Sequence, residues 1–179
     1  MMINIHDIST NEYNPNYQPY INALKETELF AALDKSYIDT VDLLKNLNET
    51  ELLYRYGKDK WTIKEIVQHL IDAERIFSYR ALRFSRNDNT DLPGYDENWF
   101  VNFSNANERS IADLLKEFYC VRSATQSLFK SFTDEMFLRS GIANRTVMSV
   151  RAAGLIISGH QWHHLNVIKD RYLSSHKNH

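Results

Sequence analysis

The sequence predicts an all-α fold, a four-helix bundle formed by a single domain that spans residues 1–179. Only five glycines and three prolines occur in 179 residues, which argues against a turn-rich β architecture. Four stretches carry apolar residues three and four positions apart, the period of a helix with one buried face. Capping signals precede two of these stretches, and the length suits one domain.

Composition and charge argue against several classes of protein. The formal net charge is −2 and basic residues are scattered among acidic ones, so we expect no nucleic-acid partner. No apolar run approaches the roughly 18 residues of a membrane span, and residues 1–16 lack the pattern of a secretory signal. The single cysteine, Cys120, lies in an apolar helical stretch, where we expect a small buried core residue rather than a catalytic thiol. These features predict a protein of the reducing cytoplasm.

The N-terminal part should consist of an arm followed by the first helix. Residues 12–20 hold two prolines and three tyrosines, so we expect residues 1–25 to wrap the bundle as an extended arm. A helix is predicted over residues 26–47 because a set of apolar residues there shares one face. The members of this set are Phe30, Leu33, Tyr37, Val41 and Leu44.

The second helix has the clearest start signal. Thr62 and Glu65 have the spacing of a capping box, which satisfies free amides at the helix entrance. Trp61 and Ile66 occupy the positions of a hydrophobic staple. We expect this helix to continue to about residue 84.

A long connection over residues 85–107 follows the second helix. It is too long to join antiparallel neighbours directly, so we expect it to cross the bundle, with Trp99 and Phe100 lining one end of a pocket. A third helix should begin at Ser110, where Asp113 suggests a second capping box, and bury a stripe of apolar residues. This stripe comprises Leu114, Phe118, Val121, Thr125, Leu128 and Phe132. The fourth helix is predicted over residues 149–173, after a loop with a strand-like turn at residues 141–147.

Two histidines one turn apart on the fourth helix form a candidate metal-binding pair. His160 and His164 are four residues apart, so their side chains lie on one face at a spacing that lets two imidazoles bind one metal ion. His163 competes with His164, since a three-residue spacing also chelates. We favour His164 because it continues the apolar stripe, whereas His163 lies on a more polar face.

A third histidine, His69, lies on the apolar face of the second helix. Each histidine alone would be interpreted as a buried, hydrogen-bonded residue. Three inward-facing histidines in one core are better explained by a shared cation, because every buried polar group needs a partner. His6, His176 and His179 lie near the termini, where we expect them to be solvated.

Charged residues near the histidines are further candidates. Asp72 follows His69 by three residues, where it would be a fourth ligand or, more readily, would orient an imidazole through its free ring nitrogen. Glu65 is a candidate for the same orienting role, and the alternative for both is a solvated helix charge or, for Glu65, capping. Arg80 lies further along the histidine face, where it would bind an anionic substrate or form a surface ion pair.

Several motifs resemble a known family: residues 12–15 (EYNP), 60–66 (KWTIKEI), 69–75 (HLIDAER), 92–95 (LPGY) and 159–165 (GHQWHHL). With these motifs nearly the whole chain resembles the DinB-like superfamily, particularly its YfiT-like branch of metal-dependent hydrolases. The resemblance implies a four-helix bundle of up-down-down-up order, a homodimer in several members, and a divalent metal ion, nickel or zinc. It also implies that the ion is held by His69, His160 and His164.

A divalent ion held by three neutral imidazoles keeps its full charge and at least one open position. Such an ion lowers the pKa of bound water to about 7 and deprotonates a bound thiol. We therefore expect a metal-dependent hydrolase or a low-molecular-weight thiol S-transferase that acts on a small molecule, with a bacillithiol-type thiol implied by analogy to related members. The alternative is a non-catalytic binding or structural module, in which Asp72 or His163 fills the fourth position and the ion clamps two helices.

Overall fold

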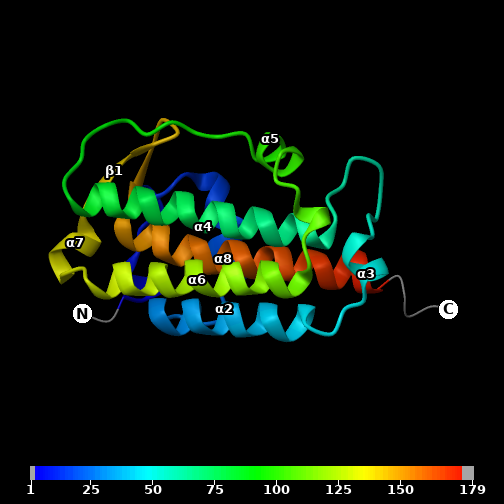
Figure 1. Cartoon of the computed structure of the whole chain (residues 1–179). Coiled ribbons are helices and arrows are strands. Elements are labelled where there is room, and N and C mark those ends of the chain that lie inside the picture. Colours follow the sequence, from blue (N-terminus) through cyan, green and yellow to red (C-terminus); the bar gives the residue numbers. More distant parts are fainter. Residues whose placement is uncertain (1–2, 175–179) are drawn as a thin grey trace.

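Four long helices form the bundle that the sequence predicts. The computed structural model describes residues 3–174. Within them α2 (Leu29–Leu44), α4 (Ile63–Ser85), α6 (Ile111–Lys130) and α8 (Val150–Val167) lie side by side (Figure 1). In Figure 1, α2 and α8 run from left to right and α4 and α6 from right to left, which is the up-down-down-up order. The predicted fold class is confirmed, and a π-helical turn, η5 (Ile168–Leu173), extends α8.

Each long helix packs against two neighbours, so the bundle closes in the order α2, α6, α4, α8. The neighbours α4 and α6 are parallel, and the chain must therefore travel back along the whole bundle between them. The connection does so over the outside and carries α5 (Glu97–Asn102) and the 3-10 turn η4 (Ala106–Glu108) (Figure 1). This is the crossover that its length predicted.

The starts of α4 and α6 are capped differently. At α4 the capping box is complete, because Glu65 N donates to Thr62 Oγ1 at 3.1 Å and Thr62 N donates to Glu65 Oε2 at 2.7 Å. At α6, Asp113 N donates to Ser110 Oγ at 3.1 Å, but the Asp113 carboxylate accepts from Arg109 Nε at 2.8 Å instead of returning to the cap. The capping box predicted at α6 is therefore wrong in its second half, because a charge-assisted bond takes the carboxylate.

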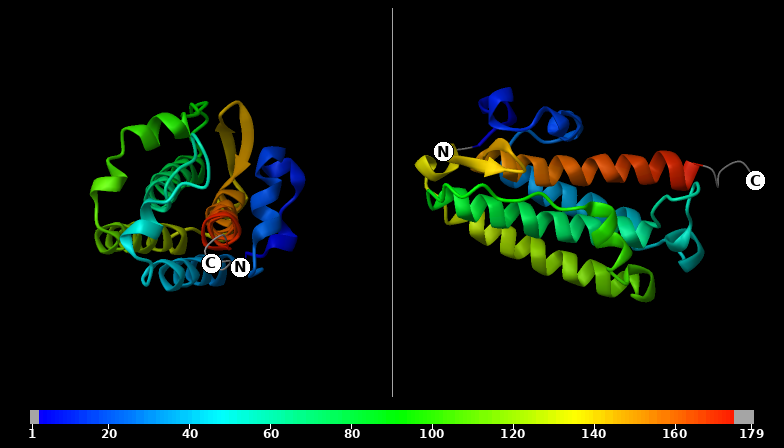
Figure 2. Two further views of the ribbon diagram at one scale, coloured as in Figure 1. Left: turned by 90° about the vertical axis from the view of Figure 1, so that its right-hand side faces the viewer. Right: turned by 90° about the horizontal axis from the view of Figure 1, so that it is seen from above.

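Residues 3–25 do not form the expected extended arm. Short helices run through this segment, and α1 packs along α8, as the blue segment of Figure 2 shows. Pro15 and Pro19 stand in the first turns of η3 and α1, where a missing N–H costs no hydrogen bond, so the prolines start helices here. These short helices are η1 (Ile5–Asp7), η2 (Thr10–Glu12), η3 (Pro15–Tyr17) and α1 (Gln18–Ala23).

An antiparallel hairpin precedes α8 and anchors the crossover. Its turn places Asn144 and Arg145 in left-handed conformations, with φ of 50° and 63°. Leu92 N donates to Ile142 O at 2.9 Å and Asn144 N donates to Leu92 O at 2.8 Å, so the crossover is tied to the hairpin. The predicted strand-like turn is thus a true hairpin. The remaining elements are α3 (Glu49–Leu53), α7 (Asp134–Leu138), β1 (Ser140–Ala143) and β2 (Thr146–Ser149).

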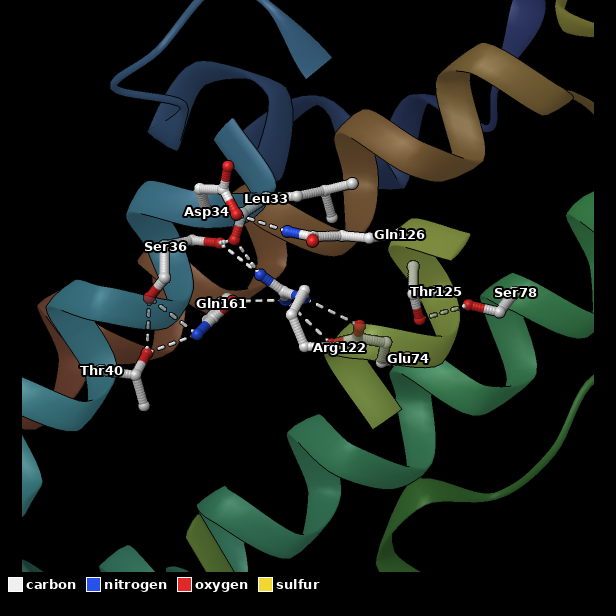
Figure 3. Close-up of polar contacts among 10 residues, drawn as sticks. All are labelled: Leu33, Asp34, Ser36, Thr40, Glu74, Ser78, Arg122, Thr125, Gln126 and Gln161. Atoms are coloured by element: carbon white, nitrogen blue, oxygen red, sulfur yellow. Dashed lines mark hydrogen bonds and ion pairs between the residues drawn. The ribbon is translucent and has the colours of Figure 1, made fainter. Parts of the chain in front are cut away.

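A buried polar cluster links all four long helices (Figure 3). Arg122 of α6 is 3% exposed and forms an ion pair with Glu74 of α4. The same guanidinium donates to Gln161 Oε1 of α8 at 2.7 Å, and to the Leu33 carbonyl and Ser36 Oγ (3.1 Å) of α2. Along α4, Glu74 lies at the boundary between two apolar core clusters. The polar cluster around Arg122 therefore fixes how the four helices are aligned.

Cys120 is exposed, so the prediction of a buried core thiol is wrong. Phe118 and Val121 lie on the buried face of α6, and Cys120 points away from it beside the exposed Tyr119. Among the helices of residues 3–174, none has the length and apolar character needed to cross a membrane.

Candidate metal centre

Three histidines from two antiparallel helices meet in the bundle interior. His69 belongs to α4, and His160 and His164 belong to α8, which packs directly against α4. His69 and His160 are 2% and 4% exposed, and His164 is half-buried. The structure thus brings together the three residues that the sequence singled out. His6 is exposed, and His176 and His179 lie outside the described residues.

The Nε2 atoms of the three imidazoles converge. His69 Nε2 and His164 Nε2 each lie 3.0 Å from His160 Nε2. An imidazole nitrogen carries either one proton or one lone pair, so His160 Nε2 can make at most one of these two contacts as a hydrogen bond. A cation that accepts a lone pair from each ring satisfies both contacts at once. The ligand atoms lie within 4.8 Å of one another, close enough to hold one metal ion.

Burial keeps these imidazoles neutral. Desolvation lowers the pKa of His69 to about 4. It also lowers the pKa values of His160 and His164 well below the ordinary value, and the neighbouring imidazoles add to the effect. A neutral imidazole keeps the lone pair that a metal ion requires. Three neutral nitrogen donors fit a divalent cation such as zinc or nickel.

Aromatic rings hold the imidazoles in place. The Trp61 ring centroid lies 4.8 Å from that of His69, and it stacks on His164 at 6.4 Å with 22° between the planes. Tyr20 of α1 packs on His160 at 4.7 Å. His164 Nδ1 is buried and has no hydrogen-bond partner in the described part of the chain, so packing rather than a hydrogen bond orients this ring. The sequence assigned Trp61 to a staple and Tyr20 to the arm, because their approach to the histidines depends on tertiary packing.

The other candidate ligands have different partners. His163 is half-buried and lies outside the converging group. The Glu65 carboxylate accepts from Arg55 Nη2 at 2.8 Å in addition to its capping bond. Asp72 accepts from Gln68 Nε2 at 3.0 Å. The structure therefore pairs both carboxylates with groups other than the imidazoles.

Two cavities reach the histidines. The smaller one, of about 60 Å³, contains His160, Arg80 and Glu97 on its wall. Arg80 is buried there, so the alternative of a surface ion pair is wrong. Burial, with a further contribution from Asp96, raises the pKa of Glu97. The larger cavity, of about 280 Å³, contains His164 and a group of aromatic and basic residues, among them Tyr56, Lys60, Trp61 and Tyr172.

The crossover contributes side chains that the sequence only partly anticipated. Trp99 and Phe100 line a cavity of about 530 Å³, as expected, but share it with Asp72 and Arg75 rather than with the histidines. Glu97, which does reach the His160 cavity, was not singled out. No sequence pattern marks Glu97 as a cavity residue, because the path of the crossover decides which of its side chains point inward.

Comparison with known proteins places this geometry in a family. No curated protein matches the sequence. The fold is similar to that of YfiT from Bacillus subtilis, described as a probable metal-dependent hydrolase with an unusual four-helix bundle topology. The TM-score is 0.70 over 79% of this chain and 82% of that chain, at 17% identity, so the likeness concerns the fold. The family model of the DinB superfamily matches residues 32–168, which is most of the sequence. This chain therefore belongs to the DinB superfamily.

Proposed function

We propose that this chain is a metal-dependent enzyme, a hydrolase of a small molecule, in which His69, His160 and His164 hold one zinc or nickel ion. The observation that carries the proposal is the convergence of three Nε2 atoms, with no fourth histidine, cysteine or carboxylate in the group within residues 3–174. Structural metal sites are usually filled by four protein ligands, whereas catalytic sites keep a position open. The three-ligand set therefore favours catalysis over a structural clamp.

The residues around the ion have separate tasks in this proposal. When bound, the ion supplies a Lewis acid that polarises a carbonyl group and activates water or a thiol. Trp61 and Tyr20 pack on the imidazoles and hold the donor atoms in position. Glu97 lines the cavity that contains His160, and its raised pKa suits a carboxyl group that exchanges a proton with a bound substrate.

A low-molecular-weight thiol S-transferase is the second candidate, and one observation favours it. The cavity at His164 is separate from the one at His160 and, at about 280 Å³, is large enough for a second molecule. A transferase needs room for both a thiol and its acceptor, whereas a hydrolase needs only a substrate and water. Lys60 and the aromatic rings of Tyr56 and Tyr172 would contact that co-substrate.

Metal analysis of the purified protein tests the site. We expect about one divalent ion per chain in the wild type and its loss in His160→Ala. The matched control is His163→Ala, which removes a histidine of the same helix outside the converging group and should keep the ion. Equal metal content in wild type and His160→Ala would reject the site.

Activity assays then separate the two reactions. Ester and amide substrates should be hydrolysed by the metal-loaded protein and not after chelation. If turnover occurs only when a low-molecular-weight thiol and an electrophile are added, the hydrolase proposal is rejected and the S-transferase proposal is supported. A metal-loaded protein that is inactive in both panels would favour the non-catalytic module.

A further inference from the structure

Arg80 is a buried arginine without a countercharge. Its side chain is 3% exposed, yet no carboxylate of residues 3–174 lies within ion-pair distance of it. One of its N–H groups donates to the Pro93 carbonyl at 3.2 Å, and the guanidinium packs over the Phe77 ring at 5.4 Å. The buried Arg122, by contrast, is fully paired with Glu74 and its neighbours. A buried charge without a partner is costly, which indicates a ligand that supplies the missing negative charge.

The Arg80 side chain points toward the histidines. Side chains on a helix lean toward its N-terminus, and the packing of Arg80 on Phe77, one turn earlier, agrees with this direction. Arg80 and His160 line the same cavity. Eleven residues separate Arg80 from His69, so their backbone positions are about 16 Å apart along α4. Because Arg80 extends toward the histidine cluster and shares a cavity with His160, the guanidinium and the cluster can hold the two ends of one small molecule.

The wall of this cavity is already formed. Gly94 approaches the hairpin so closely that an added Cβ would lie 2.6 Å from Asn144 Oδ1. Both residues line the cavity, and the hydrogen bonds of Leu92 to the hairpin hold the crossover there. Crossover and hairpin therefore form one fixed wall around Arg80, as ligand sites commonly require.

We infer that Arg80 binds a carboxylate group of the substrate, and that the substrates are small carboxylic acids whose reactive group lies several bonds from the carboxylate. The inference rests on the proposed function, because it takes the histidine cluster as the place where the reactive group is held. Arg80 would anchor the molecule and leave its other end at the metal centre.

The surroundings of Arg80 favour a carboxylate over a phosphate. A planar carboxylate matches the guanidinium fork with two parallel hydrogen bonds. One guanidinium balances one negative charge, and among residues 3–174 no lysine or second arginine lines this cavity to balance the second charge of a phosphate. One water molecule occupies about 10–15 Å³ of such a cavity. The cavity of about 60 Å³ therefore has room for a group of a few heavy atoms, such as a carboxylate.

Calorimetric titration of butyrate into the metal-free protein tests the subsite by itself. Butyrate should bind the wild type, and Arg80→Gln should weaken binding by at least about tenfold, because a charge-assisted contact is lost. The control is Arg75→Gln, which removes an exposed arginine of the same helix that pairs with Glu117 and should leave butyrate affinity unchanged. Equal affinity of wild type and Arg80→Gln, or tighter binding of inorganic phosphate than of butyrate, overturns the inference.

Arg80→Met separates a binding role from a structural one. Without ligand, this variant should unfold at the same temperature as the wild type or higher, because it removes an unpaired buried charge and keeps most of the volume. Butyrate should raise the unfolding temperature of the wild type and not that of Arg80→Met. A clear fall in the unfolding temperature without ligand would show that Arg80 supports the fold instead.

Metal content distinguishes failure of this inference from failure of the proposed function. Arg80→Gln should keep the ion and lose butyrate, and His69→Ala should lose the ion and keep butyrate. A wild type that holds the ion but not butyrate overturns the carboxylate subsite alone. A wild type that binds butyrate but holds no ion overturns the metal-dependent enzyme and leaves a carboxylate-binding site.

A chain-length series tests whether the two ends act on one molecule. Unbranched carboxylic acids with a terminal thiol would be titrated into the zinc-loaded protein. Affinity should pass through a maximum at the length that spans Arg80 and the histidines, and this maximum should disappear in Arg80→Gln. Affinity that does not depend on chain length overturns the claim that both groups hold the same ligand.

Discussion

Arg122 and Glu74 form a bidentate ion pair in the middle of the bundle. Arg122 Nε and Nη2 donate to the two carboxylate oxygens of Glu74, each at 2.8 Å, and both residues are 3% exposed (Figure 3). The pair joins the parallel helices α6 and α4. Gln161, which accepts from Arg122, directly follows His160, so the pair is connected to the helix that carries two of the histidines.

Replacing Glu74 by glutamine should lower the free energy of unfolding by about 3–5 kcal/mol, because it leaves Arg122 as a buried charge without a counterion. Urea denaturation followed by circular dichroism measures the change. Glu135→Gln is the control, since Glu135 pairs with Arg139 at the surface and is 79% exposed on its side chain. Its effect should be much smaller, and equal effects of the two variants would contradict the assignment.

The double variant Glu74→Leu with Arg122→Met should recover most of that loss, because it removes both charges together. Recovery should be incomplete, since Gln161 and the Leu33 carbonyl lose their donor. Urea denaturation of Glu74→Leu, Arg122→Met and the double variant gives the coupling energy through a double-mutant cycle. A double variant that loses the sum of the two single losses would show that the residues act independently.

The sequence predicted the parts of the molecule that depend on a repeating pattern. Helical periodicity and the Thr62 cap defined the bundle, and the four-residue spacing of His160 and His164 placed both on one face. His69 was predicted to be the third member of the cluster because it lies on the apolar stripe of its helix. Each of these features can be recognised within one helix.

Features that depend on pairing between helices could not be predicted. Glu74, Arg122 and Gln161 each lie on a different helix, and the sequence of one helix does not show which polar residue of another it meets. Only the assembled bundle shows that they satisfy one another. Asp72 was a reasonable partner for an imidazole by spacing, but Gln68 on its own helix reaches it first. The burial of Arg80 depends on the crossover and hairpin, whose paths have no periodic signature.

Zinc or nickel should stabilise the wild type against heat and should not stabilise His69→Ala. An ion that binds only the folded state adds about 2.7 kcal/mol when its concentration is 100 times the Kd. Thermal unfolding of chelator-treated protein, with and without added metal, measures this effect. His163→Ala serves as the control and should respond like the wild type. The same shift in His69→Ala would mean that the ion binds elsewhere.

Gly159→Ala should destabilise the protein, although glycine to alanine within a helix normally gains about 1 kcal/mol. An added Cβ would lie 2.1 Å from the Tyr20 carbonyl oxygen, a backbone atom that cannot rotate away. Helix α1 would have to move from α8 and take the Tyr20 ring away from His160. We expect a loss of about 1–3 kcal/mol in urea denaturation. Gly57→Ala is the control, because its Cβ would meet only Lys60 at 3.6 Å.

The ion pair between Glu12 and Arg151 should make stability depend on pH. Arg151 donates to the two Glu12 oxygens at 2.8 and 2.6 Å, which ties η2 to the start of α8. Burial acts to raise the pKa of Glu12, but hydrogen bonds from Arg151 and from the Ser9 amide outweigh it, so this pKa lies below its ordinary value of 4.5. A carboxylate with a lowered pKa in the folded state binds its proton more readily in the unfolded chain. Its contribution is therefore complete above the unfolded pKa and is lost as the pH falls through the folded one.

Glu12→Gln measures that contribution directly. At pH 7 the variant should lose about 1–2 kcal/mol of unfolding free energy, a value reduced by the partial exposure of the pair. The difference between wild type and variant should shrink as the pH falls below about 4.5, because the wild-type carboxyl then becomes protonated and resembles the neutral amide. Urea denaturation of both proteins over this range supplies the comparison. A difference that stays constant down to the lowest pH at which both proteins fold would show that Glu12 acts through packing and not through its charge.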